Sequence, residues 1–236
     1  HDFLAIEVKC SYNYPIKPTL DLSIPQINAD DVWLLSSNGI NITGTAQTVC
    51  VIDTGVDYTH SIFGTCTSET VIDGTCPRVI GGYDFGNSDN DPRDVHSHGT
   101  HVAGIAVSND TTYRGVAPDA SVVALKVFNN AGAGNTAWAI SAIDWCVNNA
   151  TKYNITAITM SFGITDSGGN EIIHTTACDS ADGSGLAAAA SAAAAHGLFV
   201  GASSGNAGSS TGVSSPACGE NVTSVGKVSD SDAISS

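Results

Sequence analysis

The stretch that decides the fold is Thr48-Val49-Cys50-Val51-Ile52, which runs directly into Asp53-Thr54-Gly55. Its first half is mostly apolar and rich in β-branched side chains, which is typical of a buried strand in a parallel sheet. The aspartate comes where that strand ends. Because open α/β sheets place ligands at the carboxyl ends of their strands, Asp53 is a candidate site residue. A plain turn aspartate is the alternative for this segment taken alone.

Apolar strands and helical patterns alternate along the rest of the chain. Strands are expected at 121–128, 155–162, 198–202 and 222–228, and helices before residue 34, from residue 98, at 136–149 and at 186–196. This alternation predicts an α/β fold of three layers, with helices on both faces of a mostly parallel central sheet. Residues 61–96 are turn-rich and polar. Two prolines indicate that residues 1–20 are a linker before a single domain at 21–236.

The composition limits the classes of partner. The chain has 236 residues, enough for one domain with a real core, and a net charge of −15 with only 8 Lys and Arg. That charge argues against nucleic acid and anionic membranes. No run of 18 or more apolar residues occurs, so no membrane span is predicted. The chain starts at His1 and its only methionine is Met160, which indicates a processed chain or a fragment.

The cysteines point to an oxidising compartment. Seven are many for a cytosolic domain, and Cys66 and Cys76 bracket a small loop that suits a disulfide. Sequons add weak support for secretion. We also expect a Cys146–Cys178 disulfide and a buried thiol at Cys50 in the central strand, whereas Cys10 and Cys218 stay unassigned.

A histidine-dense segment, Asp94-Val95-His96-Ser97-His98-Gly99-Thr100-His101-Val102-Ala103-Gly104, runs from polar residues into small and apolar ones. This pattern predicts a loop that enters a buried helix at His98. The neutral form of an imidazole is abundant near neutral pH, which suits a general base. An aspartate at a strand end, such as Asp53, could hold that base in the required tautomer.

The loop Ser203-Ser204-Gly205-Asn206-Ala207-Gly208 follows the strand expected at 198–202. Its asparagine lies among small residues, so its amide could face an open site and donate to a developing oxyanion. Parallel strands bring their carboxyl ends to one edge, and we therefore expect Asn206, Asp53 and His98 to lie on the same side of the sheet. An ordinary loop asparagine is the alternative.

Taken in order, these motifs resemble those of the subtilisin-like serine proteases (subtilases, peptidase family S8). Further similar segments are Gly115-Val116-Ala117-Pro118, Lys126-Val127 and Met160-Ser161-Phe162-Gly163, and the resemblance covers about residues 21–236. It implies the subtilisin-like fold and a secreted, monomeric serine endopeptidase (a hydrolase) acting on protein or peptide substrates. By the same resemblance residues 1–20 could be a propeptide remnant, and the protease could bind its own propeptide.

The resemblance also assigns roles to residues. Asp53 is the orienting acid, His98 the base and Asn206 the oxyanion donor. Two further segments would bind the substrate backbone and form walls of the P1 pocket, which holds the side chain before the scissile bond; their residues are Ser161, Phe162, Gly163, Ser203, Ser204 and Gly205. Ala207 and Ser214 lie where the family lines this pocket, and because neither is charged we expect medium to large apolar P1 residues.

One departure concerns the nucleophile. The family's reactive serine lies in a Gly-Thr-Ser-Met-Ala-type motif beyond the segment similar to 222–236, and no Gly-Thr-Ser occurs in this chain. We therefore expect a catalytic domain that is incomplete at its C-terminus, with an Asp-His-Ser triad whose serine is not in this chain. The alternative is a catalytically dead, truncated paralogue or fragment that at most binds peptides.

The acidic loop before the histidine motif resembles a calcium loop of some thermitase-like members. Close spacing of oxygen ligands suits a hard cation, and the candidate ligands of a structural Ca²⁺ are Asp84, Asn87, Asp89 and Asp91. The alternative is an acidic surface loop.

Two other kinds of site are less well supported. Asp53-Thr54-Gly55 with Asp166-Ser167-Gly168 could suggest an aspartic protease, but the second turn lacks an apolar strand before it and that class is mostly antiparallel β. A zinc site at His96, His98 and His101 would need a spacing that is not standard for zinc, and no clear further ligand stands out.

Overall fold

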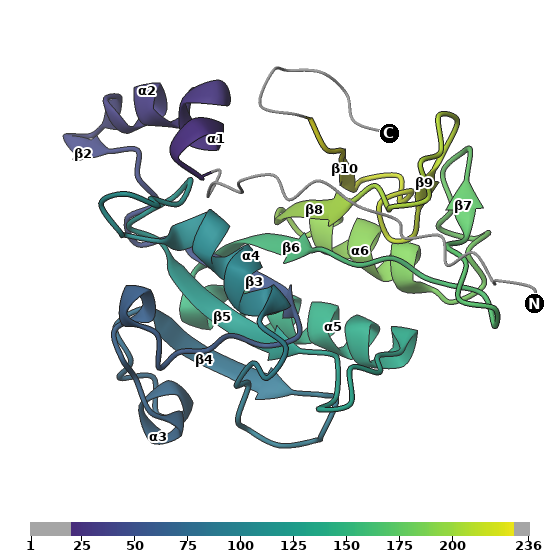
Figure 1. Cartoon of the computed structure of the whole chain (residues 1–236), viewed down its shortest axis with the longest axis horizontal. Helices are drawn as coiled ribbons and strands as arrows, with labels where there is room; N and C mark the ends of the chain where they lie inside the picture. The colour runs from purple at the N-terminus through teal and green to yellow at the C-terminus, as the bar shows by residue number, and fades with distance from the viewer. Residues whose placement is uncertain (1–19, 229–236) are drawn as a thin grey trace, which may run out of the picture.

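The computed structural model describes residues 20–228 and centres on a six-stranded parallel sheet (Figure 1). The strand order is β10-β8-β6-β3-β5-β4, and all neighbours pair in parallel. The strands are β3 (Thr48–Asp53), β4 (Val79–Asp84), β5 (Ser121–Lys126), β6 (Ile155–Met160), β8 (Phe199–Ser203) and β10 (Thr223–Val225). The predicted α/β fold is confirmed, and the strand ending at Asp53 lies inside the sheet.

Helices cover both faces of this sheet (Figure 1). On one face α5 (Thr136–Tyr153) and α6 (Leu186–Ala195) pack on a core that includes Cys50 and Ile52. On the other face α4 (His98–Val107) packs on a second core that includes Val51. Successive residues of a strand point to opposite faces, so a strand buried on both faces is continuously apolar, as 49–52 is.

The remaining elements lie around the sheet. The short helix predicted before residue 34 is present as two pieces. The elements are α1 (Leu20–Gln26), α2 (Ala29–Trp33), β1 (Ser36–Ser37), β2 (Ile40–Asn41), η1 (Ser61–Phe63), α3 (Ser68–Ile72), β7 (Ile173–His174) and β9 (Val213–Ser214). The predicted linker falls on residues 1–19, outside the described residues, except for its last position. No described helix is long and apolar enough to cross a membrane.

Sheet strand β4 and two short helices, η1 and α3, lie in the segment 61–96, which the sequence describes as turn-rich and polar. Strand β4 contains Gly81 and Gly82, which lack the side chains that make a strand recognisable. A Cβ on Gly82 would lie 2.2 Å from the Ala124 carbonyl oxygen, and one on Gly81 would lie 3.0 Å from the Tyr153 ring. The close packing of β4 at the sheet edge therefore requires glycines, and glycines do not give the apolar, β-branched pattern by which a strand is recognised in a sequence.

Three disulfides join the described cysteines, and they correct two expectations. The predicted Cys66–Cys76 bridge is present. Cys50 is not a free thiol: it reaches across the core from β3 to α5 and bonds Cys146, 96 positions away. The expected Cys146–Cys178 bridge was wrong for the same reason, and Cys178 bonds Cys218 instead. Pairing depends on which helix covers which strand face, and spacing along the chain does not show this.

Candidate active site

An aspartate and a histidine meet at the carboxyl end of the sheet. Asp53 is the last residue of β3 and His98 is the first residue of α4, as predicted. The Nδ1 atom of His98 lies 2.7 Å from Oδ1 of Asp53. The side chain of His98 is 53% exposed, whereas that of Asp53 is 1% exposed. The pair thus has a buried acid that supports a base open to solvent.

The carboxylate of Asp53 sets the tautomer of the imidazole. Burial raises the pKa of Asp53 above its ordinary value, and the hydrogen bonds from His98 and Thr54 act in the opposite direction. When ionised, this carboxylate can only accept, so Nδ1 of His98 carries the hydrogen and Nε2 keeps its lone pair. Nε2 makes no hydrogen bond to any residue between 20 and 228. His98 is therefore arranged to take a proton from an incoming group.

A second aspartate, which our reading of the sequence missed as a site residue, positions the helix that carries His98. Asp94 is buried, and its Oδ1 accepts from the Thr54 hydroxyl at 3.0 Å. Its Oδ2 accepts from the Thr100 hydroxyl at 2.6 Å and from the Thr100 N–H at 2.9 Å. A carboxylate at a helix N-terminus satisfies free N–H groups and suits the helix dipole. Its place four residues before His98, at the entry of the predicted helix, was the available signal.

Close backbone contact completes the support of this pair. The N–H of Gly99 donates to the Thr54 hydroxyl at 2.8 Å. A Cβ on Gly99 would lie 2.2 Å from the Gly55 carbonyl oxygen, which no larger residue could tolerate. The glycine after His98 is needed for α4 to approach the loop after β3, and this approach brings the imidazole within reach of Asp53.

Asn206 lies in the loop after β8 and therefore at the same edge of the sheet as Asp53, because β8 and β3 run parallel. Asn206 is exposed, and its side-chain amide has no hydrogen-bond partner among the described residues. Its backbone N–H donates to Oε2 of Glu171 at 2.6 Å. No hydrogen bond joins Asn206 to His98 or Asp53. The amide is free to donate to a ligand, as the oxyanion role requires.

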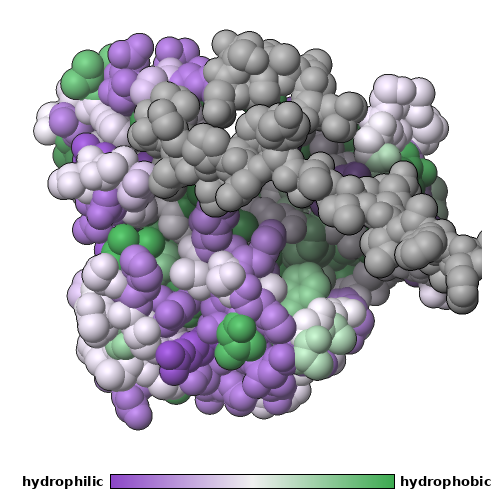
Figure 2. Space-filling view, in the orientation of Figure 1, coloured by the Kyte–Doolittle hydropathy of each residue, from purple (hydrophilic) through white to green (hydrophobic). Residues whose placement is uncertain are grey.

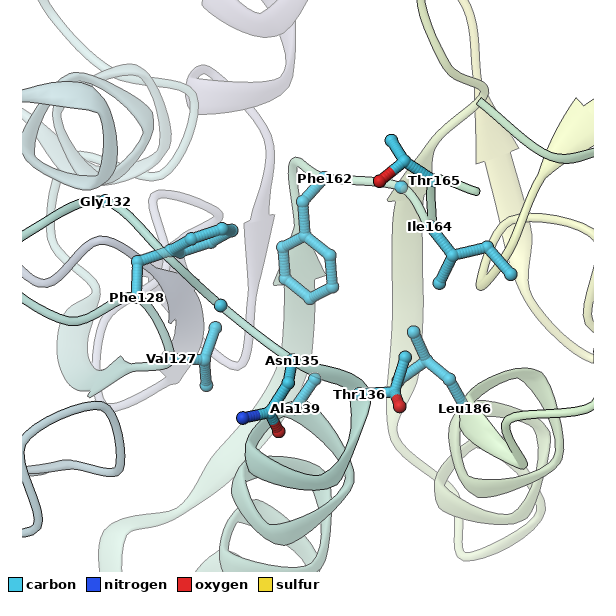
Figure 3. A pocket seen from close by; sticks show the side chains of 12 residues that line it. Val127, Phe128, Gly132, Asn135, Thr136, Ala139, Phe162, Ile164, Thr165 and Leu186 are labelled. Carbon is cyan, nitrogen blue, oxygen red and sulfur yellow. The ribbon is translucent and has the colours of Figure 1, made fainter. Parts of the chain in front are cut away.

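The two predicted substrate segments lie side by side. Ser161-Phe162-Gly163 follows β6 and Ser203-Ser204-Gly205 begins at the end of β8, and the register pairs Met160 with Ala202. Next to the first segment is a cavity of about 400 Å³, where Phe128 and Phe162 make an edge-to-face contact with ring centroids 5.8 Å apart (Figure 3). The arrangement provides strand ends for an extended peptide and an apolar cavity for one of its side chains.

The four predicted calcium ligands are not brought together around one point. Asp84 is buried, and its Oδ2 accepts from Lys126 Nζ at 2.5 Å and from the Asn87 side chain at 2.7 Å. Asp91 Oδ1 accepts from the Tyr58 hydroxyl at 2.6 Å, and Asp89 Oδ1 accepts from the Asp91 N–H at 2.8 Å. Protein donors thus occupy one oxygen or more of each of the three carboxylates, and calcium binding at this loop stays a prediction to which no step of the chemistry is assigned.

Comparison with known proteins agrees with this geometry. Residues 44–236 match the subtilase family, Peptidase S8. A thermophilic serine proteinase of Bacillus sp. (strain AK1) is 36% identical over 193 residues, which is 80% of this chain and 40% of that protein. Subtilisin DY of Bacillus licheniformis is 33% identical over 212 residues, 89% of this chain and 65% of that protein.

The structure is also similar to a solved relative. A cold-adapted subtilisin-like serine proteinase superposes with a TM-score of 0.63 at 29% identity, covering 86% of this chain and 63% of that one. The chain spans between 40% and 65% of the length of the two curated relatives named above. The strand-end aspartate, the helix-start histidine and the family match over residues 44–236 agree, and the chain belongs to the subtilase family.

Proposed function

We propose that the protein is a secreted serine endopeptidase of the subtilisin type, acting on protein or peptide substrates. The observation that carries this proposal is the 2.7 Å contact between Asp53 Oδ1 and His98 Nδ1, with Nε2 of His98 left open to solvent. A base held in this way can activate a hydroxyl nucleophile. Membership of the subtilase family supports the same activity.

In the proposed reaction, Nε2 of His98 takes the proton of a serine hydroxyl as its oxygen attacks the peptide carbonyl. Asp53 stabilises the imidazolium that forms, and the Asn206 amide donates to the oxyanion of the tetrahedral intermediate. His98 then gives the proton to the leaving amine, which leaves an acyl-enzyme. Water, activated by the same histidine, hydrolyses this ester and restores the serine.

The serine is proposed to come from a segment outside residues 1–236. A groove of about 360 Å³ supports this: it lies beside α4, between Val102 and Ile105 of that helix and Met160, Phe199 and Val225 of the sheet. Phe199 and Val225 are more than half exposed, which is unusual for large apolar groups of a sheet face. Figure 2 shows, more generally, that apolar side chains are exposed in a recess of the viewed face, to the right of centre. An apolar segment that covers the groove would lie next to the helix that begins at His98.

The alternative is a chain that only binds peptides. It is favoured by one observation: no serine hydroxyl in residues 20–228 makes a hydrogen bond to His98. A fluorophosphonate probe separates the two, because it labels only an activated serine. We expect the full-length protein to be labelled and its His98→Ala variant to lose labelling, with a fall of several orders of magnitude in kcat.

The 236-residue chain by itself is expected to stay unlabelled in the same assay. Stoichiometric labelling of this chain would contradict the assignment of the serine to another segment. Absence of labelling and of turnover in the full-length protein would favour the peptide-binding alternative.

The proposed extracellular location of the protein is supported by the three disulfides. Free thiols at both Cys66 and Cys76 in protein isolated without reducing agent would contradict it.

A further inference from the structure

We propose that Glu171 makes this protease select substrates with lysine or arginine at P1, the residue before the scissile bond. The inference rests on the proposed function and concerns the same cleft. It differs from the apolar P1 preference expected from the sequence, because that expectation was based only on the uncharged residues Ala207 and Ser214.

Glu171 is held rigidly by the hairpin that follows the first substrate segment. The Ile172 N–H donates to the Ile164 carbonyl at 3.0 Å, and a β-bridge joins Thr165 to Glu171. Directly after it, β7 pairs with β9, with Ile173 opposite Ser214. The backbone of Glu171 is thus fixed on both sides, which determines where its side chain can reach.

The carboxylate reaches the junction of the two substrate segments. Its Oε2 accepts from the Asn206 N–H at 2.6 Å. A Cβ on Gly205 would lie 2.7 Å from this oxygen and 3.3 Å from Cβ of Ser214. A Cβ on Gly163 would in turn lie 2.6 Å from the Ser214 hydroxyl. Ser214 therefore lies between Gly163 and Gly205, and the carboxylate of Glu171 lies against Gly205, where the two substrate segments come together.

Within the described part of the chain, no cation forms an ion pair with this carboxylate. The ion pairs among residues 20–228 are Arg93–Asp57, His98–Asp53 and Lys126–Asp84, and none includes Glu171. Glu171 is half-buried, and its Oε1 has no hydrogen-bond partner in the described chain. A half-buried carboxylate without a cation favours a ligand that brings a positive charge, and charge-assisted hydrogen bonds are the strong ones.

The same charge penalises other substrates. An apolar P1 side chain would exclude water from the carboxylate and offer no hydrogen bond in return. The negative charge also lies at the backbone N–H of Asn206, whose side chain is the proposed oxyanion donor, and it therefore opposes the negative charge that develops on the substrate. A lysine or arginine at P1 would neutralise it. Selectivity for a cation thus follows from attraction of one substrate class and rejection of another.

The test uses the full-length protease and two fluorogenic peptides that differ only in arginine or leucine at P1. We expect wild-type kcat/KM to favour arginine by at least about tenfold. Glu171→Gln keeps an oxygen to accept from the Asn206 N–H but has no charge. It should lower the arginine-to-leucine ratio by about 10–100-fold, chiefly through loss of arginine cleavage. A structural role alone would lower both activities together.

A matched control removes one negative charge elsewhere: Asp144 is exposed on α5, and Asp144→Asn should leave the ratio unchanged. The inference is overturned if the active wild type prefers leucine, or if Glu171→Gln changes both substrates equally. The proposed function fails differently, because an inactive full-length protein would cleave neither peptide and would not be labelled by a fluorophosphonate.

Discussion

At the scale of a single residue, the buried carboxylate of Asp53 lowers the stability of the fold but is required to orient His98. It is 1% exposed, and its Oδ2 is buried without a hydrogen-bond partner among the described residues. An ionised carboxylate in such surroundings is costly, which is why burial raises the pKa of Asp53. The same ionised form is required to hold the imidazole of His98. Functional residues often conflict with folding in this way.

We expect Asp53→Asn to stabilise the fold at neutral pH and to destroy activity. Because the pKa of Asp53 in the folded state lies above the ordinary value of 3.8, the folded state binds this proton more tightly than the unfolded chain. The free energy of unfolding therefore falls as pH rises from about 4 through the raised pKa. The asparagine variant has no such loss, so it should match the parent at about pH 3 and exceed it at about pH 7.

Urea denaturation of both proteins at the two pH values measures this difference. The activity of the variant should fall by about four orders of magnitude, because the amide no longer selects the Nδ1–H tautomer. A variant that is less stable than the parent at neutral pH would show that the carboxylate is satisfied by groups other than His98 and Thr54.

Asn206 is expected to act on the transition state alone. Its side-chain amide has no partner among the described residues, so Asn206→Ala leaves no other group unpaired. We expect kcat to fall by about 10²–10³ with little change in KM, the range seen for loss of such a donor in subtilisin itself. Steady-state kinetics on the full-length protease test this. A change confined to KM would make Asn206 a binding residue.

At the scale of elements, the buried Lys126–Asp84 pair joins the ends of β5 and β4 beneath the acidic loop. Lys126 is 0% exposed and Asp84 is 2% exposed. Breaking a buried pair by removing one partner leaves an unpaired charge, which costs about 3–5 kcal/mol. We expect Lys126→Met to destabilise the protein by this amount in urea denaturation. Replacing both partners by apolar residues should recover much of the loss.

The calcium hypothesis stays a prediction, and the same loop tests it. If Ca²⁺ binds there, EDTA lowers the Tm and speeds proteolysis within residues 84–97, and Asp89→Ala has the same effect. If Lys126 alone balances Asp84, EDTA leaves the Tm unchanged while Lys126→Met still lowers it. The second outcome would remove calcium from the description of this protein.

At the scale of the whole molecule, the site residues lie along one edge of the sheet, and the helices of residues 20–228 cover one of its faces only in part. Asp53 and Ser203 end β3 and β8, and Ser161 directly follows β6 between them, so parallel pairing alone places all three on one edge. Helices α5 and α6 cover one face, whereas α4 covers only part of the other and leaves the groove beside Phe199. One further segment that covers the groove with apolar side chains and brings a serine to Nε2 of His98 would complete both features.

The sequence by itself determined the sheet strand at 48–53, the helix that begins at His98 and the order of the motifs. These features depend on neighbouring residues: a run of apolar side chains makes a strand, and small residues after a histidine make a close-packed helix. The proposed roles of Asp53, His98 and Asn206 could be assigned for the same reason, since each lies inside a local motif.

Only the tertiary structure decided which distant residues support the site. Asp94 contacts Thr54 from 40 positions away, and Glu171 contacts Asn206 from 35 positions away. Cys50 finds its partner across 96 positions. Local patterns carry no information on these contacts, because they depend on which helix covers which face and which loop folds over which strand end. The position of the Glu171 carboxylate beside Asn206, and with it the expected P1 preference, became apparent only through that packing.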